Sequence, residues 1–200
     1  AASSELAAPA DRAAQAAAAL TALLERGQEE LAKLPPEERG TSVLINDVGE
    51  LLRESGRTEE AKALFTEALN MRRLQLGDRD VATLTSINNL GLLLREEQCY
   101  DEARPLLQEA CDARRAVQGD THPETLTAIN NLGALLKASG DLEAAEPLYE
   151  EALAARRDVL GTRHPDYLTS VNNLASLYLA RARFYEAEPL LVEASSTSKK

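Results

Sequence analysis

The chain has 200 residues, of which 44% are hydrophobic and 28% are charged, so it can bury a core. Aromatic residues make up 4% of the chain and Trp is absent, which argues against a β-sandwich or a β-barrel. The 22 basic and 33 acidic residues give a formal net charge of −11. A chain this acidic lacks the basic surface that binding to nucleic acid or to an anionic membrane requires, so neither partner is expected.

Cysteine content and hydropathy limit the cellular locations that are expected for the protein. Cys99 and Cys111 are too few for a disulfide framework, and nothing indicates an oxidising environment. No stretch approaches the ~20 apolar residues that span a bilayer, so no transmembrane insertion is expected. The chain begins at Ala1 in an Ala-rich segment, which suggests either a removed targeting segment or a piece of a longer protein. The expected location is therefore the cytoplasm or, after removal of a targeting segment, an organelle interior.

In chain order, the first predicted element is a helix from Pro9 to Leu34, which the Pro35-Pro36 pair ends. Because the open end of a repeat array would expose an apolar face, we interpret this helix as an N-terminal cap. Its buried side is predicted to consist of Leu20, Leu23, Leu24, Leu31 and Leu34.

The rest of the chain repeats with a period of 42 residues, from Ile87 to Ile129 and again to Val171. INNLGLLL, INNLGALL and VNNLASLY begin at these positions, and the related INDVGELL begins one period earlier, at Ile45. Each unit contains two apolar stripes with helical steps of three and four residues, separated by a turn. The pattern predicts four helical hairpins. The predicted organisation is a tail and capping helix at 1–39, hairpins at 40–81, 82–123 and 124–165, and a last hairpin with a polar tail at 166–200.

Small residues recur where the two helices of each hairpin should meet. A backbone without a large Cβ substituent lets two helices approach closely. The first-helix positions with this property are Gly49, Gly91, Gly133 and Ala175.

This pattern resembles the tetratricopeptide repeat in the 42-residue form found in kinesin light chains and related adaptor proteins. The family's positions are met in the third unit by Leu132, Gly133, Leu136, Ala145, Tyr149 and Ala152.

The resemblance runs from about Thr41 to Ala194 and includes the turns His122-Pro123 and His164-Pro165. The second unit departs from it, with Asp80-Val81 at the His-Pro position, and the first unit departs in its Asn-Leu pair. The family resemblance implies an all-α, right-handed superhelical solenoid whose first helices line a concave groove. Identity with a kinesin light chain is not supported, because the sequence contains no sustained heptads for a coiled coil.

Residues able to carry chemistry are few. His122 and His164 lie one period apart with no Cys or carboxylate at metal-ligand spacing, so we interpret them as turn residues. Cys99 and Cys111 form no CxxC motif and are expected to be free thiols. No phosphate-binding glycine loop, GxSxG or HExxH motif occurs. We therefore expect no catalytic residue, no metal, no cofactor and no enzymatic activity.

The repeated Asn-Asn pairs are the most informative residues. We interpret the side chain of the second Asn of each pair, at 89, 131 and 173, as forming a hydrogen bond that ties one helix to its neighbour. The first Asn matches the family position that faces the groove, where its amide can hold the backbone of an extended peptide. These predicted groove residues are Asn46, Asn88, Asn130 and Asn172.

Counting helical turns from the first Asn extends the predicted groove. Three residues earlier lie Thr85, Thr127 and Thr169, and four residues later lie Leu92, Ala134 and Ser176. Seven residues later lie three cations, Arg53, Arg95 and Lys137. They have two interpretations: solvated charge paired with nearby glutamates, or a strip that selects carboxylates and thus acidic peptides.

The pairs Arg72-Arg73, Arg114-Arg115 and Arg156-Arg157 end the second helices. We interpret them as cations that complement the helix dipole rather than as a phosphate site.

Three functions remain. The first is an adaptor whose groove captures an extended, acidic segment of a partner protein. The second is a structural subunit of a large assembly, possibly organellar, held through its convex surface and by its open ends near Leu190, Leu191 and Val192. The third is a scaffold fragment of a longer regulatory protein. Repeats of this kind serve unrelated functions, so the fold alone does not choose among them.

Overall fold

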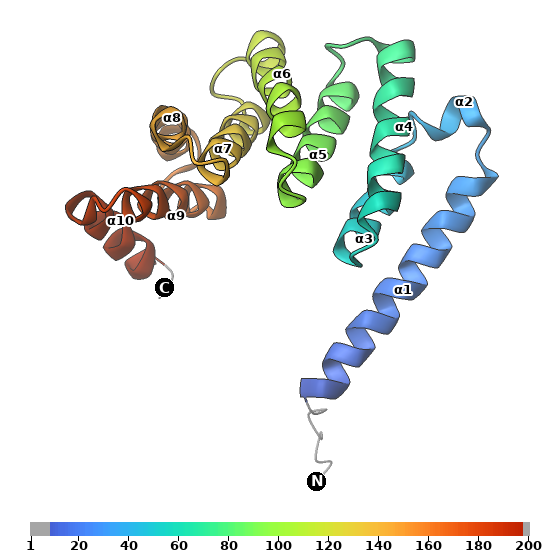
Figure 1. The fold of residues 1–200 in the computed structure, drawn as a ribbon, viewed down its shortest axis with the longest axis horizontal. Coiled ribbons are helices and arrows are strands. Elements are labelled where there is room, and N and C mark those ends of the chain that lie inside the picture. The colour runs from blue at the N-terminus through green and yellow to red at the C-terminus, as the bar shows by residue number, and fades with distance from the viewer. Residues whose placement is uncertain (1–8, 198–200) are drawn as a thin grey trace. The chain divides into compact units, whose positions relative to one another are not determined.

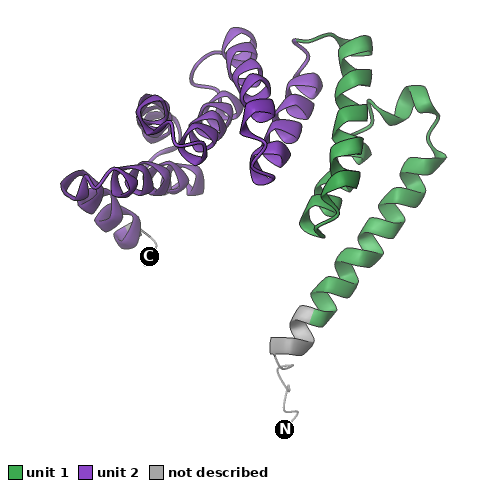
Figure 2. Cartoon of the chain, in the orientation of Figure 1, with its two compact units in different colours: residues 1–78 green, residues 79–200 purple. Residues whose placement is uncertain are grey.

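Helices provide all the regular structure in residues 9–197, the part of the chain that the computed structural model describes. The chain divides into two units, residues 1–78 and 79–200 (Figure 2), and each has its own core.

The first unit contains α1 (Pro9–Lys33), α2 (Pro36–Arg39), α3 (Val43–Glu54) and α4 (Thr58–Leu76) (Figure 1). Helices α3 and α4 form a hairpin, and α1 packs against α3 through Leu24 and Leu31, both buried. The prediction that Leu23 belongs to the buried side of α1 is wrong, because 57% of its surface is exposed. Leu23 lies one residue, about 100° around the helix, away from the stripe that faces α3.

The second unit contains α5 (Val81–Glu96), α6 (Tyr100–Gln118), α7 (Pro123–Ala138), α8 (Leu142–Leu160), α9 (Pro165–Ala180) and α10 (Phe184–Thr197). Consecutive helices form the hairpins α5–α6, α7–α8 and α9–α10, and each second helix also packs on the first helix of the next hairpin. Together with α3–α4, these hairpins confirm the predicted all-α fold of four helical hairpins preceded by an N-terminal helix.

The turns between hairpins begin the next helix through specific caps. The Nδ1 atoms of His122 and His164 accept hydrogen bonds from the backbone N–H groups of Glu124 (3.2 Å) and Asp166 (3.1 Å). In each case a proline follows as the first helical residue, where its missing N–H is of no consequence. The turn role predicted for the two histidines is therefore confirmed.

The helices of each hairpin meet at the small residues of the first helix. A Cβ atom added to Gly49 would lie 2.4 Å from the ring of Phe65, and one added to Gly91 would lie 2.8 Å from Leu107. At Gly133 the nearest atom of Tyr149 would be 3.0 Å away. The absent Cβ thus makes room for the large residue that the second helix places there.

The first arginine of each Arg-Arg pair is buried, which corrects the interpretation from the helix dipole. Arg156, 3% exposed, donates to the carbonyl oxygen of Asp166 (3.0 Å), to Ser170 Oγ (2.9 Å) and to Thr127 Oγ1 (3.1 Å). It therefore joins α8 to both α7 and α9. Burial lowers the pKa of the Arg156 guanidinium. The long arginine side chain has several donors and can reach neighbouring helices, so its partners cannot be read from its position in the sequence.

In the second unit, the second arginine of each Arg-Arg pair joins successive second helices. Arg115 on α6 forms an ion pair with Glu151 on α8 (2.7 Å), and one period later Arg157 on α8 lies 3.8 Å from Glu193 on α10. Both pairs hold neighbouring hairpins in the same register.

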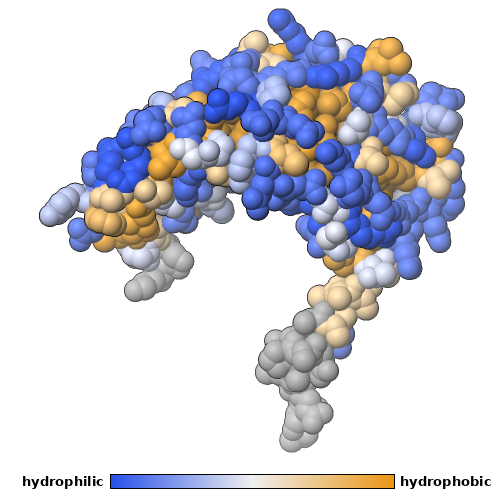
Figure 3. Space-filling model, in the orientation of Figure 1, coloured by the Kyte–Doolittle hydropathy of each residue, from blue (hydrophilic) through white to orange (hydrophobic). Residues whose placement is uncertain are grey.

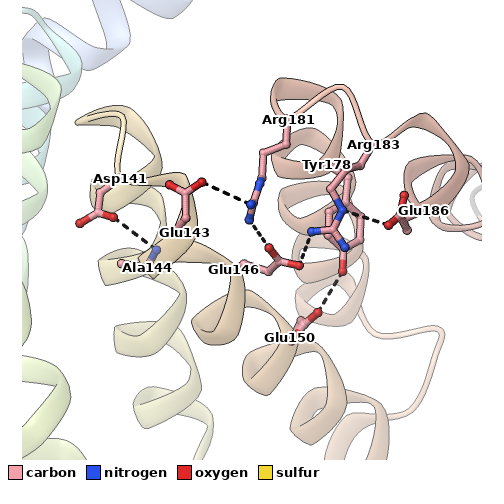
Figure 4. Close-up of polar contacts among 9 residues, drawn as sticks. All are labelled: Asp141, Glu143, Ala144, Glu146, Glu150, Tyr178, Arg181, Arg183 and Glu186. Carbon is pink, nitrogen blue, oxygen red and sulfur yellow. Dashed lines mark hydrogen bonds and ion pairs between the residues drawn. The ribbon is translucent and has the colours of Figure 1, made fainter.

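A polar network attaches the last hairpin to α8 (Figure 4). Arg181 and Arg183 both bind Glu146, and the guanidinium of Arg183 stacks 4.4 Å from the centre of the Tyr178 ring. The Tyr178 hydroxyl donates to Glu150 (3.0 Å). These groups hold α9, the first helix of the last hairpin, against α8, the second helix of the preceding hairpin.

An ion pair equivalent to Glu146–Arg183 occurs one period earlier, with the acidic and the basic residue exchanged. Arg104 on α6 binds Asp141 at 2.7 Å. These residues lie 42 positions before Glu146 and Arg183. The two repeats therefore have an ion pair at equivalent positions, but the position that contributes the base in one contributes the acid in the other.

We expect Gly49→Ala to destabilise the protein by roughly 1–3 kcal/mol, because the new Cβ would overlap the fully buried ring of Phe65. Gly133→Ala should cost less, since its nearest neighbour would be at 3.0 Å. Urea unfolding followed by circular dichroism measures both. Equal stability of Gly49→Ala and the unmodified protein would contradict this account of the hairpin contact.

Candidate functional site

The first helices of the second unit, α5, α7 and α9, contact one another in sequence order. Hydrogen bonds between asparagine side chains join them. Asn131 Nδ2 on α7 donates to Asn88 Oδ1 on α5, and Asn173 Nδ2 on α9 donates to Asn130 Oδ1 on α7, each at 2.9 Å. Asn131 and Asn173 thus each tie one helix to its neighbour, as interpreted from the sequence. What the sequence did not reveal is that the partner of each is the first Asn of the preceding hairpin.

The predicted groove asparagines have different degrees of exposure. Asn172 is exposed and Asn88 is half-buried, whereas Asn130 is 8% exposed. Asn46 lies on α3 in the first unit, where its buried Oδ1 has no hydrogen-bond partner among the described residues. Bonding to Asn131 and Asn173 occupies the oxygens of Asn88 and Asn130, which leaves their Nδ2 atoms as the groups that can donate to a ligand.

The predicted threonines serve mainly the structure. Thr85 Oγ1 accepts from Arg114 (3.2 Å) and Thr127 Oγ1 from Arg156 (3.1 Å), so both hydroxyls help to satisfy buried guanidinium groups. Thr169 is exposed, and its hydroxyl donates to the carbonyl oxygen of Pro165 (3.0 Å). This role was not foreseen, although the 29-residue separation from the arginines recurs from repeat to repeat.

The predicted cations separate into two environments. Arg53, on α3, forms an ion pair with Glu50 at 2.7 Å, as the solvated-charge interpretation predicts. Arg95 and Lys137, at the ends of α5 and α7, line one cavity of about 490 Å³. The residues that line this cavity, here called the cation pocket, are Arg95, Ala134, Lys137, Ala138, Tyr149 and Asn173.

The cation pocket has an excess of hydrogen-bond donors and positive charge. Its lining contains no carboxylate, and neither Arg95 nor Lys137 forms an ion pair within the described part of the chain. Lys137 Nζ instead donates to Ser176 Oγ on α9, and burial lowers the pKa of its ammonium group. Burial also raises the pKa of Tyr149 to about 12, so its hydroxyl remains protonated at neutral pH. An anion is the complement of such a site.

Other site chemistries find no support in the described residues. No group of three or more His, Cys, Asp or Glu residues suited to a metal ion occurs among them. Within the same residues, no helix combines the length and apolar character that crossing a membrane needs.

The model of the tetratricopeptide repeat family matches residues 40–98, 80–158 and 129–200. The chain belongs to the tetratricopeptide repeat family. Proteins of this family are in general non-catalytic interaction scaffolds, and the match indicates a protein-interaction module.

Solved structures with kinesin-light-chain-like repeats share the fold. A kinesin light chain protein of Podospora anserina with nearly identical TPR-like repeats has 22% identity and a TM-score of 0.76, with coverage of 94% of this chain and 90% of that one. BtubC (BKLC) from P. vanneervenii has 23% identity and a TM-score of 0.72, with coverage of 92% and 72%. The resemblance to kinesin-light-chain-like repeats is thus confirmed.

A Rap protein crystallised with Competence and Sporulation Factor is also similar, with 15% identity and a TM-score of 0.73 over 88% of this chain and 47% of that one. At these identities the structural likeness establishes the fold alone. A search of curated proteins found no match.

We expect Asn173→Ala to destabilise the protein by about 1–3 kcal/mol, because it leaves the Oδ1 atom of the buried Asn130 without its donor. Asn172→Ala is the matched control, since it removes an exposed neighbour and should change stability by less than about 0.5 kcal/mol. Thermal and urea unfolding of both variants measures the difference. Similar effects of the two substitutions would show that the Asn173–Asn130 bond does not hold the first helices together.

Proposed function

We propose that this protein binds an extended, acidic segment of a partner protein along its first helices. The observation that carries the proposal is the cation pocket, in which Arg95 and Lys137 meet without a carboxylate. Because the chain has a net charge of −11, a pocket lined by two cations and no acid is unusual on its surface.

Two other cations, Arg115 on α6 and Arg183 in the turn before α10, show the contrast. Arg115 is bound to Glu151 and Asp120, and Arg183 to Glu146 and Glu186. Arg95 and Lys137 are half-buried and have lost part of their hydration without gaining such a partner. A carboxylate from a ligand would supply the missing counter-charge where water is partly excluded.

The asparagine and threonine rows are proposed to hold the ligand's backbone. The Nδ2 atoms of Asn88 and Asn130 can donate to peptide carbonyl groups, and the exposed Asn172 can donate and accept. Arg53 and the threonine positions are proposed to make weaker, local contacts, because their own polar atoms are partly engaged in the fold. Asn46, whose Oδ1 has no hydrogen-bond partner among the described residues, is proposed to make a local contact on α3. Backbone contacts of this kind give affinity with little demand on sequence, and the cation pocket would then provide the preference for acid.

The proposal predicts that Arg95→Glu/Lys137→Glu abolishes binding of a fluorescein-labelled, Glu-rich peptide, measured by fluorescence anisotropy. A loss of at least about tenfold in affinity is expected, since two charge-assisted hydrogen bonds are replaced by repulsion. Thermal unfolding should be nearly unchanged.

The matched control is Arg79→Glu/Arg163→Glu, which alters the net charge equally at two exposed positions outside the pocket. Equal binding by the pocket variant and the unmodified protein would overturn the proposal. An equal loss in both double variants would show that net charge, and not the pocket, governs binding.

A second function, a structural subunit of a larger assembly, is favoured by the last helix. Tyr185 (92% exposed), Phe184, Leu191 and Val192 leave an apolar surface on α10 (Figure 3). Leu191 is 43% exposed, whereas Tyr149 and Leu107, one and two periods earlier, are at most 1% exposed. In those hairpins the next first helix packs on the same helix. A helix of a partner could cover α10 in the same way.

Measuring the native mass of the protein isolated from its source, whether from cytoplasm or from an organelle interior, separates the two functions. The adaptor function predicts a small species with substoichiometric companions. A stoichiometric, salt-resistant particle that Tyr185→Glu/Val192→Glu disrupts would instead establish the structural role.

A further inference from the structure

We infer that the cation pocket takes a phosphorylated serine or threonine side chain within the partner segment, an inference that rests on the proposed peptide-binding function. The pocket lies among α5, α7, α8 and α9 of the second unit, and each of these helices contributes a lining residue.

The charge of the cation pocket matches a phosphoryl group better than a carboxylate. Arg95 and Lys137 bring two positive charges to one cavity whose lining contains no acid. A single carboxylate from a Glu or Asp side chain would neutralise one of them. A phosphoryl group carries about −1.5 to −2 charges at neutral pH and would neutralise both.

The cation pocket also offers more hydrogen-bond donors than one carboxylate can accept. A guanidinium offers five N–H groups in a planar fork that matches phosphate oxygens, and Lys137 keeps two N–H groups beyond the one given to Ser176. Tyr149, which lines the same pocket as Arg95, adds a hydroxyl that burial keeps protonated by raising its pKa to about 12. A carboxylate has two oxygens to accept these donors, whereas a phosphoryl group has three.

The cation pocket is large enough for a phosphorylated side chain. The cavity of about 490 Å³ lies in the ~300–1,000 Å³ range of sites for small ligands, and is larger than one carboxylate requires. Two of its lining residues, Ala134 and Ala138, have small side chains, which leaves room for a side chain that ends in a tetrahedral phosphoryl group.

The test uses three labelled peptides that are identical and Glu-rich except at one central residue, which is Ser, Glu or phosphoserine. Affinity is measured by fluorescence anisotropy, with inorganic phosphate as a competitor. The phosphoserine peptide should bind at least about tenfold more tightly than the Glu peptide, which should bind more tightly than the Ser peptide.

Two variants assign the preference to the pocket. Arg95→Lys keeps the charge but removes the planar fork, so it should reduce the phosphoserine preference while retaining affinity for the Glu peptide. Arg79→Glu/Arg163→Glu should leave the preference intact. An Arg95→Lys variant with full preference would contradict the role assigned to the guanidinium.

The outcomes separate this inference from the proposed function. Equal affinity for the phosphoserine and Glu peptides would overturn the phosphoryl inference and leave acidic-peptide binding standing. Failure of all three peptides to bind would overturn both. Inorganic phosphate that binds as tightly as the phosphoserine peptide would identify a free phosphate compound, and not a phosphorylated protein, as the ligand.

Discussion

Neither helix of a hairpin can bury its apolar stripe alone, and the structure follows from how closely neighbouring helices must therefore pack. Gly49, Gly91 and Gly133 allow the second helix to bring a Phe, Leu or Tyr side chain against the first helix. Each second helix then packs on the next first helix in the second unit. Positions 42 residues apart in the sequence thereby become neighbours in space, which places Arg95 beside Lys137.

Several polar groups inside this packing pair with one another. The Asn131–Asn88 and Asn173–Asn130 bonds join the first helices, while Arg156 spans from α8 to α7 and α9. Such buried donors would be costly if unpaired, so they fix the register between hairpins. Against this background of internal pairing, the unneutralised cations of the pocket are the groups that a ligand can satisfy.

Much of the fold could be predicted from the sequence because every repeat reports the same geometry. The helical stripes, the His-Pro turns and the Gly contacts are local features, and a period of 42 residues repeats them in register. The site could be predicted less well, because the partner that a long side chain reaches does not follow from its position in the sequence. Sequence spacing placed Arg53, Arg95 and Lys137 in one row and left pairing with nearby glutamates as one interpretation. It could not show which of the three cations are neutralised: Glu50 binds Arg53, whereas the other two share a cavity. Nor could it show that Thr85 and Thr127 face buried arginines, since those contacts join helices through side chains of variable reach.

The central claim is that ligands bind on the first helices, at the cation pocket. Nuclear magnetic resonance titration of the isotope-labelled 21.7 kDa chain with a Glu-rich peptide tests it most directly. The account predicts that the largest shift changes fall on Arg95, Lys137 and the side-chain amides of the α5, α7 and α9 asparagines. Shift changes concentrated on α6, α8 and α10, with those residues unaffected, would contradict it.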